Sequence, residues 1–137
     1  MVDQLVVSRR LLKLRQYVEL LKQLRQETKE RFVSDPFVHG NAERYLQLAI
    51  QTVLDIGNHI VADRKLKEPQ EYRDIIRTLC REGLLSNELA ERLVPLVGLR
   101  NILVHDYLEI DREKLYDALH NELDDFEEFA THIAKLL

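Results

Sequence analysis

The densest group of chemically reactive side chains lies in one stretch of eight residues. Residues 100–107 read RNILVHDY and bring together a guanidinium, an amide, an imidazole, a carboxylate and a phenol. Three apolar residues separate these groups and are expected to anchor the segment against a core. The candidates for chemistry are Arg100, Asn101, His105 and Tyr107.

These residue types suit the cleavage of a phosphodiester bond in RNA. Such cleavage needs a base to deprotonate the 2′-hydroxyl, an acid to protonate the leaving 5′-oxygen, and positive charge on the pentavalent phosphorane. Histidine suits both proton transfers because its unperturbed pKa lies near neutrality. Arginine offers a permanent charge and a planar fork of donors for the phosphate. His105 and Arg100 are therefore candidates for these two roles.

Helical geometry limits how the candidates meet. Positions five apart on a helix differ by about 140° around its axis, so Arg100 and His105 would point in rather different directions. Either the helix ends between them, or the site is shared between two chains. Asn101 and His105 are four apart and could face one side, as could Arg100 and Tyr107, which are seven apart. Spacing alone leaves ordinary roles open: an ion-pairing arginine, a structural histidine and a half-buried aromatic residue.

Two long helices are expected before this segment. The first covers about residues 3–30 and ends before Pro36, which disfavours helical geometry at the preceding residue. Its apolar seam is Val7, Leu11, Leu14, Val18 and Leu21. The second covers about residues 41–65, with a polar stripe of Glu43, Gln47, Gln51, Asp55 and His59. The stripe predicts a hydrogen-bonded interior seam or a surface that faces a partner.

Three further helices are predicted from local signals. Pro69 fits the first turn of the third helix, and Gly83 its C-terminal cap. Ser86 is a natural N-cap for the fourth helix, in which Pro95 should introduce a kink or a division. Asp111 can cap a fifth helix. The apolar face of that helix is Leu115, Leu119, Phe126, Ala130, Ile133 and Leu137.

Composition agrees with a helical protein. Apolar residues make up 45% of the 137 residues and charged residues 32%, with only 4 glycines and 3 prolines. No segment alternates at a period of two, and no internal repeat is visible. The predicted fold is all-α, an antiparallel bundle of about five helices that forms a single domain over residues 1–137.

Charge is distributed unevenly along the chain. Residues 1–31 carry eight Lys or Arg against four acids, whereas residues 109–128 carry nine acids against two bases. The net charge of −4 argues against indiscriminate nucleic-acid binding but leaves room for RNA in a local basic cleft. The plain interpretation is that both segments are solvated helix faces.

Several classes of protein and site are disfavoured. Cys80 is the only cysteine, so no intramolecular disulfide is expected, and it is interpreted as a small core residue. Asp55 and His59 form an i, i+4 pair, but two ligands do not make a metal site, and no metal or other cofactor is expected. No run of about 18 apolar residues and no secretory segment is present, which favours the cytoplasm. The remaining histidines are interpreted as surface groups: His39, His120 and His132.

The RNILVHDY segment closely resembles the HEPN superfamily. The mark of that superfamily is an arginine and a histidine separated by four to six residues, and four separate Arg100 from His105. Asn101 matches the polar residue often found after the arginine, and Tyr107 narrows the resemblance to the HepT family. Residues 41–60 look like the second helix of that family, and residues 69–98 resemble the segment that leads into the motif.

The resemblance implies a five-helix protein that forms a homodimer, with the motifs of both subunits lining one cleft. Two copies of His105 would then supply the acid and the base, with Arg100 on the phosphate and Asn101 orienting the site. It also implies a metal-independent ribonuclease toxin whose substrate is RNA. The partner would be a nucleotidyltransferase antitoxin of the MNT type that transfers AMP onto Tyr107. The added charge and bulk would repel RNA.

A rival hypothesis remains from the sequence. HEPN domains include non-catalytic members, so the chain could be a nucleotide-binding or scaffold subunit of a nucleotidyltransferase complex. The acidic balance suits a protein that binds proteins better than RNA. Intact Arg100 and His105 favour the ribonuclease.

Overall fold

In the computed structural model, residues 3–105 and 110–137 are described, and within these ranges all regular structure is helical. The helices are α1 (Gln4–Leu24), α2 (Lys29–Ser34), α3 (Pro36–Asp63), α4 (Tyr72–Arg81), α5 (Asn87–His105), α6 (Arg112–Asn121) and α7 (Leu123–Ala134). The all-α prediction is confirmed. The expected number of about five helices is wrong for this chain, because two of the expected helices are each divided in two.

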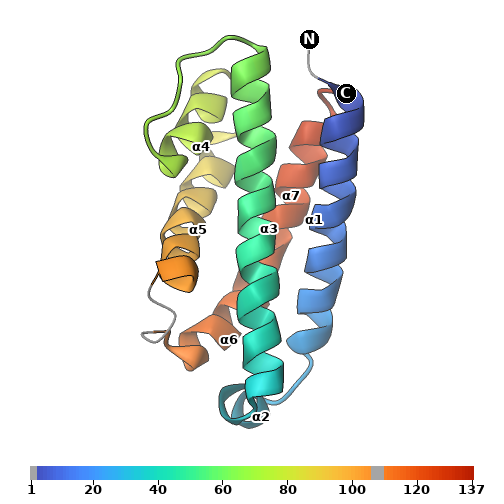
Figure 1. The fold of residues 1–137 in the computed structure, drawn as a ribbon, viewed down its shortest axis with the longest axis vertical. Coiled ribbons are helices and arrows are strands. Elements are labelled where there is room, and N and C mark those ends of the chain that lie inside the picture. The colour runs from blue at the N-terminus through green and yellow to red at the C-terminus, as the bar shows by residue number, and fades with distance from the viewer. Residues whose placement is uncertain (1–2, 106–109) are drawn as a thin grey trace.

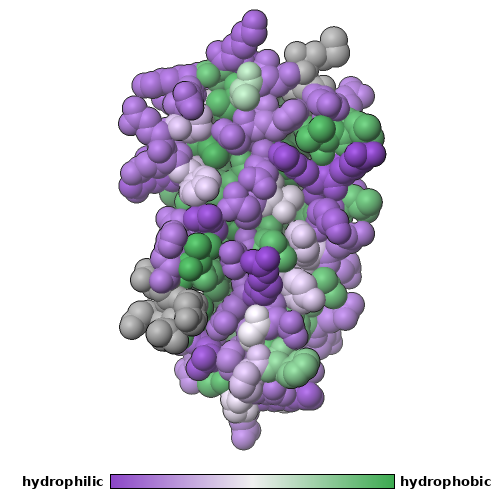
Figure 2. All heavy atoms as spheres, in the orientation of Figure 1, coloured by the Kyte–Doolittle hydropathy of each residue, from purple (hydrophilic) through white to green (hydrophobic). Residues whose placement is uncertain are grey.

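The long helices run antiparallel around a common core (Figure 1). Helix α3 packs against α1 on one side and against α4 and α5 on the other, while α7 contacts α1 and α5. The short helices α2 and α6 contact each other at the opposite end from the C-terminus. The visible face is largely hydrophilic, with apolar side chains in small patches between polar ones (Figure 2). Within the described residues, no helix has the length and apolar character needed to cross a membrane.

The predicted seam of α1 lies in the core. Val7, Leu11, Leu14, Val18 and Leu21 are all buried. The helix itself ends at Leu24 rather than near residue 30, because Thr28 begins a new helix. The Thr28 hydroxyl accepts a hydrogen bond of 3.2 Å from the Arg31 amide, which satisfies one of the free donors at the start of α2.

Helix α3 starts earlier than its apolar pattern suggests. It begins at Pro36 instead of near Asn41, since the Asp35 carboxylate accepts a 2.9 Å hydrogen bond from the Phe37 amide. Proline costs nothing at this first helical position. Phe37 itself is 82% exposed.

Helix α4 packs closely on α3 at Gly57. A Cβ atom at this position would lie 2.5 Å from Ile75 Cγ2 and 3.1 Å from Leu79 Cδ1. The missing side chain therefore lets the two helices approach and places α4 against the C-terminal half of α3. Pro69 lies before α4 and not in its first turn, because the helix begins at Tyr72 after Glu71. The Glu71 amide donates to the Asp74 carboxylate at 3.1 Å.

The turn from α4 to α5 follows its local signals. Gly83 has a φ of 75°, as expected for a glycine that ends a helix. Ser86 Oγ accepts a hydrogen bond of 3.2 Å from the Leu89 amide and so caps α5 as predicted. Pro95 does not divide α5, which is continuous to His105. Pro95 and Glu91 are both exposed, so water can bond to the carbonyl that the proline leaves free.

The predicted fifth helix is two helices. Asp111 caps α6 by accepting from the amides of Glu113 and Lys114 at 3.0 and 3.2 Å. At Glu122 the chain changes direction and α7 begins. The break allows α6 to contact α2 while α7 contacts α1 and α5. Every residue of the predicted apolar face is buried except Leu137.

Candidate functional site

Three of the four predicted site residues lie on the last turns of α5. Arg100 is half-buried, whereas Asn101 and His105 are exposed. Since α5 extends to His105, the helix does not end between Arg100 and His105, and that alternative is wrong. The two side chains leave the helix about 140° apart. Tyr107 and Asp106 lie outside the described residues.

The Arg100 guanidinium is held by three different helices. Its Nε donates to Gln51 Oε1 on α3 at 3.0 Å, and its Nη1 donates to Asn101 Oδ1 at 3.0 Å. The guanidinium carbon lies 4.6 Å from the centre of the Tyr72 ring, at the start of α4. An arginine has five N–H donors. Among the described residues, these contacts use two of them and leave three for a ligand.

The acceptor oxygen of Gln51 is turned towards Arg100 by a second hydrogen bond. Gln51 Nε2 donates to Asp55 Oδ1 at 2.9 Å, one turn later on α3. The Asp55 main-chain carbonyl accepts from Arg10 Nη1 on α1 at 3.1 Å. A row of polar contacts therefore runs from α1 through α3 to α5. At Gln51 and Asp55 the polar stripe predicted on the second helix is hydrogen-bonded, but Asp55 is exposed, so the stripe is not an interior seam at that residue.

Two cavities border the same contacts. One, of about 420 Å³, is lined by Glu71, Tyr72, Arg73, Val94, Val97, Gly98 and Asn101. The other, of about 380 Å³, is lined by Gln51, Leu54, Asp55, Asn58, Glu68, Pro69, Gln70, Glu71, Tyr72 and Ile75. Each cavity is lined by two of the three residues that contact Arg100. Tyr72 lines both cavities.

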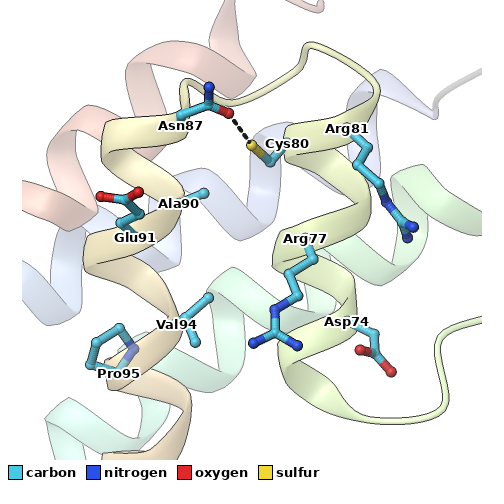
Figure 3. Close-up of a pocket in the computed structure, with 9 residues that line it drawn as sticks. All are labelled: Asp74, Arg77, Cys80, Arg81, Asn87, Ala90, Glu91, Val94 and Pro95. Atoms are coloured by element: carbon cyan, nitrogen blue, oxygen red, sulfur yellow. Dashed lines mark hydrogen bonds between the residues drawn. The ribbon is translucent and has the colours of Figure 1, made fainter.

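A larger cavity of about 820 Å³ lies between α4 and α5 (Figure 3). It shares Val94 with the cavity beside Asn101. In the close-up, the Arg77 side chain extends along the cavity, whereas Arg81 points away from α5. Cys80 packs at the edge of the core, and its Sγ donates to Asn87 Oδ1 at 2.9 Å.

Asp55 and His59, the pair considered for a metal, differ in their contacts. The Asp55 carboxylate accepts from Gln51, and His59 Nε2 is buried with no hydrogen-bond partner among the described residues. No group of three or more His, Cys, Asp or Glu side chains in residues 3–105 and 110–137 is arranged to hold a metal ion.

One histidine interpreted as a surface group is buried. His39 is 7% exposed, and burial lowers the pKa of its imidazole, with a further lowering from Arg112. Its Nδ1 lies 3.8 Å from Glu43 Oε1, and neither atom has a hydrogen-bond partner in the described part of the chain. His120 and His132 hydrogen-bond the carbonyls one turn earlier, each at 2.9 Å.

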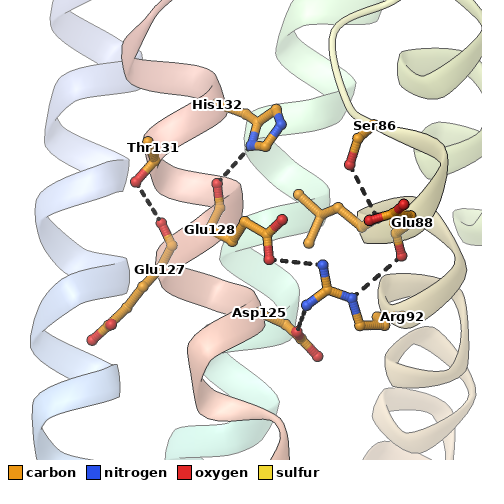
Figure 4. Close-up of polar contacts among 9 residues, drawn as sticks. Ser86, Glu88, Arg92, Asp125, Glu127, Glu128, Thr131 and His132 are labelled. Carbon is orange, nitrogen blue, oxygen red and sulfur yellow. Dashed lines mark hydrogen bonds and ion pairs between the residues drawn. The ribbon is translucent and has the colours of Figure 1, made fainter.

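Arg92, a second arginine on α5, forms ion pairs with carboxylates of α7. Arg92 Nη1 pairs with Asp125 at 2.6 Å, Nη2 pairs with Glu128 at 2.7 Å, and Nε donates to the Glu88 carbonyl at 3.3 Å (Figure 4). Asp125 is 5% exposed, and burial raises the pKa of its carboxyl group while Arg92 opposes that rise. The cluster joins α5 to α7.

Ion pairs join the basic N-terminal segment to the acidic segment that covers α6 and the start of α7. Lys22 on α1 pairs with Glu127 on α7, and Lys29 at the start of α2 pairs with Asp117 on α6 at 3.2 Å. The interpretation of these segments as solvated faces is therefore only partly right, since some of their charges join helices.

Sequence reasoning missed two residues of the site. Gln51 appeared only as part of the polar stripe, and Tyr72 was not considered as a site residue. The stripe was the available signal for Gln51. Nothing in the sequence marked the 40% exposed Tyr72 ring as the surface on which Arg100 lies.

Comparison with known sequences points to one family. The sequence pattern of the family described as ribonuclease HepT-like matches residues 14–133. A protein of Shewanella oneidensis named mRNA nuclease HepT is 38% identical over 84 residues, which cover 61% of this chain and 63% of that protein. The match thus spans less than two thirds of that relative's length. The tRNA nuclease HepT of Aphanizomenon flos-aquae is 29% identical over 138 residues, covering 99% of this chain and 92% of that protein.

Comparison with solved structures agrees. The tri-AMPylated HEPN toxin of Shewanella oneidensis, solved in complex with an MNT antitoxin, superposes with a TM-score of 0.89 at 28% identity. The superposition covers 98% of this chain and 99% of that one. The helical arrangement is therefore shared over nearly the whole length of this chain. By sequence pattern, which extends over most of its length, the chain belongs to the HepT-like ribonuclease family.

Proposed function

We propose that this protein is the toxin of a toxin–antitoxin pair and acts as an endoribonuclease in the cytoplasm. In this proposal a homodimer cleaves RNA without a metal ion. His105 carries out proton transfer, Arg100 stabilises the phosphate and Asn101 orients the site. The names of the relatives as mRNA and tRNA nucleases support RNA as the substrate class.

The observation that best supports the proposal is the set of contacts that Arg100 makes. Its guanidinium is fixed by Gln51, Asn101 and Tyr72, and three of its N–H donors remain for a ligand among the described contacts. A fixed cation with free donors suits the charge that develops on a phosphorane. The exposed His105 lies on the next turn and a half of the same helix. These two side chains supply charge and proton transfer, so the proposed mechanism needs no metal.

In the proposed reaction, the 2′-oxygen displaces the 5′-oxygen at phosphorus. A neutral His105 imidazole takes the proton of the 2′-hydroxyl, and the 2′-oxygen attacks the adjacent phosphorus. The bond from phosphorus to the 5′-oxygen breaks, and a protonated imidazole gives its proton to the leaving oxygen. The products are a 2′,3′-cyclic phosphate and a 5′-hydroxyl. Arg100 donates to the non-bridging oxygens as their charge rises.

The reaction requires two imidazoles, one neutral and one protonated. Each chain supplies one His105, at the end of α5. A homodimer supplies the second. The apolar surface near the motif supports such an association: Ile102 on α5 is 41% exposed. Beside it is a groove of about 350 Å³ between α5 and α6, lined in part by Leu99 and Ile110.

Neutralisation is proposed to occur at Tyr107. A nucleotidyltransferase antitoxin of the MNT type would transfer AMP onto its hydroxyl, and the added phosphate charge would repel RNA from Arg100. The similarity to a tri-AMPylated HEPN toxin in complex with an MNT antitoxin supports this partner and this modification. Peptide mass spectrometry after co-expression with the antitoxin is expected to find AMP on Tyr107. Full neutralisation with an unmodified Tyr107 would contradict it.

The ribonuclease proposal is tested on partner-free protein in EDTA. Intact mass first establishes that Tyr107 is unmodified. Wild-type protein is then expected to cut tRNA or mRNA to products with 2′,3′-cyclic phosphate ends, and His105→Ala is expected to lose at least a hundredfold in rate. Products with only plain 3′-hydroxyl ends would contradict the mechanism. No cleavage by either protein, with ATP binding to the dimer, would favour the rival non-catalytic subunit.

A further inference from the structure

Among the described residues, the groups that contact Arg100 are neutral. Its two hydrogen-bond acceptors are the side-chain amides of Gln51 and Asn101, and its third contact is the face of the Tyr72 ring. Within the described residues it has no carboxylate partner at 4.0 Å or less. An amide oxygen fixes a guanidinium by a directional hydrogen bond without neutralising its charge. The charge thus stays available for an anionic ligand.

The contact with Gln51 has a definite direction. Because Gln51 Nε2 donates to Asp55, the Gln51 oxygen is the atom that faces Arg100 Nε. Arg10 on α1 in turn donates to the Asp55 carbonyl. The acceptor for Arg100 is therefore itself held by the Asp55 carboxylate, and the Arg10 contact joins α1 to α3 at the same residue.

The Tyr72 ring is held in place by helix packing. Tyr72 is the first residue of α4, and α4 is seated on α3 through the close approach at Gly57. One face of the ring supports the guanidinium, and the ring borders both cavities beside the site. Stacking on an aromatic face restricts the plane of the guanidinium, whereas the hydrogen bond to Gln51 restricts its rotation within that plane.

We infer that Gln51 and Tyr72 are positioning residues that fix the Arg100 guanidinium with its Nη donors turned towards the reacting phosphate. The inference rests on the proposed function of Arg100. A free arginine side chain carries substantial rotamer entropy, which it would lose when the transition state forms. Gln51 and Tyr72 remove that loss in advance, so their effect falls on the rate of the chemical step.

Steady-state kinetics on one RNA oligonucleotide tests the catalytic part. Gln51→Leu and Tyr72→Leu are each expected to lower kcat about tenfold with little change in KM. Tyr72→Phe keeps the ring face and should recover most of the loss. The matched control is Gln47→Leu, one turn earlier on the same half-buried stripe, which has no hydrogen bond to Arg100. It should behave as wild type.

A double-mutant cycle separates positioning from general damage to the fold. In an Arg100→Lys background, which lacks the planar guanidinium, Gln51→Leu is expected to lower kcat by less than about twofold. A tenfold loss in both backgrounds would overturn the inference, because Gln51 would then act independently of Arg100. Equal kcat values for Gln51→Leu, Tyr72→Leu and Gln47→Leu would overturn it as well.

Nuclear magnetic resonance tests the same contacts without activity. The Arg100 Nε–H signal, assigned by its loss in Arg100→Lys, is expected to exchange slowly with water in the wild type. Gln51→Leu should speed that exchange at least tenfold, and Tyr72→Leu should remove the ring-current shift of the Arg100 side chain. Rapid exchange in the wild type, unchanged by Gln51→Leu, would overturn the inference. Slow exchange in a protein that cuts no RNA would support the positioning and contradict the proposed function alone.

Discussion

Arg92 and Arg100 lie two turns apart on α5 and have opposite surroundings. Arg92 is paired with two carboxylates, Asp125 and Glu128, and the hydrogen bond to Glu128 raises the pKa of its guanidinium. Arg100 is held by two amides and an aromatic ring. The positive charge of Arg92 is thus offset by two carboxylates, whereas the described partners of Arg100 leave its charge without such an offset.

The difference distinguishes a structural contact, at Arg92, from the contact that we propose to be functional, at Arg100. At Arg92 the guanidinium compensates a buried carboxylate, Asp125, and joins α5 to α7. At Arg100 the neutral partners fix the direction of the guanidinium, and no described carboxylate at ion-pair distance consumes its charge. Both arginines have defined partners, but among the described residues only Arg100 lacks a carboxylate that offsets its charge. The type of the partner, more than the presence of a partner, marks the candidate for catalysis.

The largest expected effect follows from removing Arg100, the arginine proposed to act in catalysis. Arg100→Leu should lower the rate of RNA cleavage by about a hundredfold to a thousandfold, because a fixed donor to the developing phosphate charge is lost. Its free energy of unfolding should change by less than about 1 kcal/mol, since Arg100 is half-buried and compensates no described charge. Cleavage assays and urea denaturation measure the two quantities. Cleavage at the wild-type rate would remove Arg100 from the proposed mechanism.

Arg92→Leu should show the opposite pattern, with a loss of stability and near-normal cleavage in the folded protein. The loss should depend on pH. Burial already raises the pKa of Asp125 above its ordinary value, and loss of Arg92 should raise it further. The folded state then holds an unpaired charged carboxylate at neutral pH, and this cost disappears as the pH falls through the raised pKa and Asp125 is protonated.

Urea midpoints for wild type and Arg92→Leu at pH 7 and near pH 4 measure this effect. The difference between the two proteins should be larger at pH 7. Adding Asp125→Asn to Arg92→Leu is expected to restore part of the midpoint at pH 7, because it removes the unpaired charge. A difference that is equal at both pH values would mean that Arg92 contributes by packing and not by compensating Asp125.

The two arginines also show what the sequence could and could not predict. Sequence signals predicted correctly the features that depend on neighbouring residues alone: the buried seam of α1, the left-handed Gly83 and the Ser86 cap. The α6–α7 break carries no glycine or proline signal. It arises because α6 and α7 pack against different helices, which is a property of the assembled fold.

The site was predictable only in part, because it too depends on packing between helices that are distant in sequence. Residues 100–105 were identified from their types and spacing, and the resemblance named the family that sequence comparison bears out. The partners of Arg100 come from positions 49 and 28 residues earlier, Gln51 and Tyr72. No periodicity within one helix can pair such distant residues. The roles of Arg100, Asn101, His105 and Tyr107 in catalysis and modification stay predictions.

The smallest expected effect comes from making the surroundings of Arg100 resemble those of Arg92. Gln51→Glu replaces an amide acceptor by a carboxylate of nearly the same shape, so the guanidinium should keep its position while its charge is offset. The rate of cleavage should fall roughly fivefold to tenfold, on the scale of a charge-stabilisation loss of about 1 kcal/mol. Slow exchange of the Arg100 Nε–H in this variant would establish that its position is retained.

Asp55 provides the control for this substitution. A new carboxylate at position 51 would lie within reach of Asp55 Oδ1, which now accepts from the Gln51 amide. The double variant Gln51→Glu/Asp55→Asn restores a donor to that contact and should separate repulsion by Asp55 from the offset of Arg100. If the double variant still cleaves slowly while Arg100 remains fixed, the charge of Arg100 limits the rate. A return to the wild-type rate would instead show that the neutrality of position 51 is unimportant, and the contrast with Arg92 would then concern geometry alone.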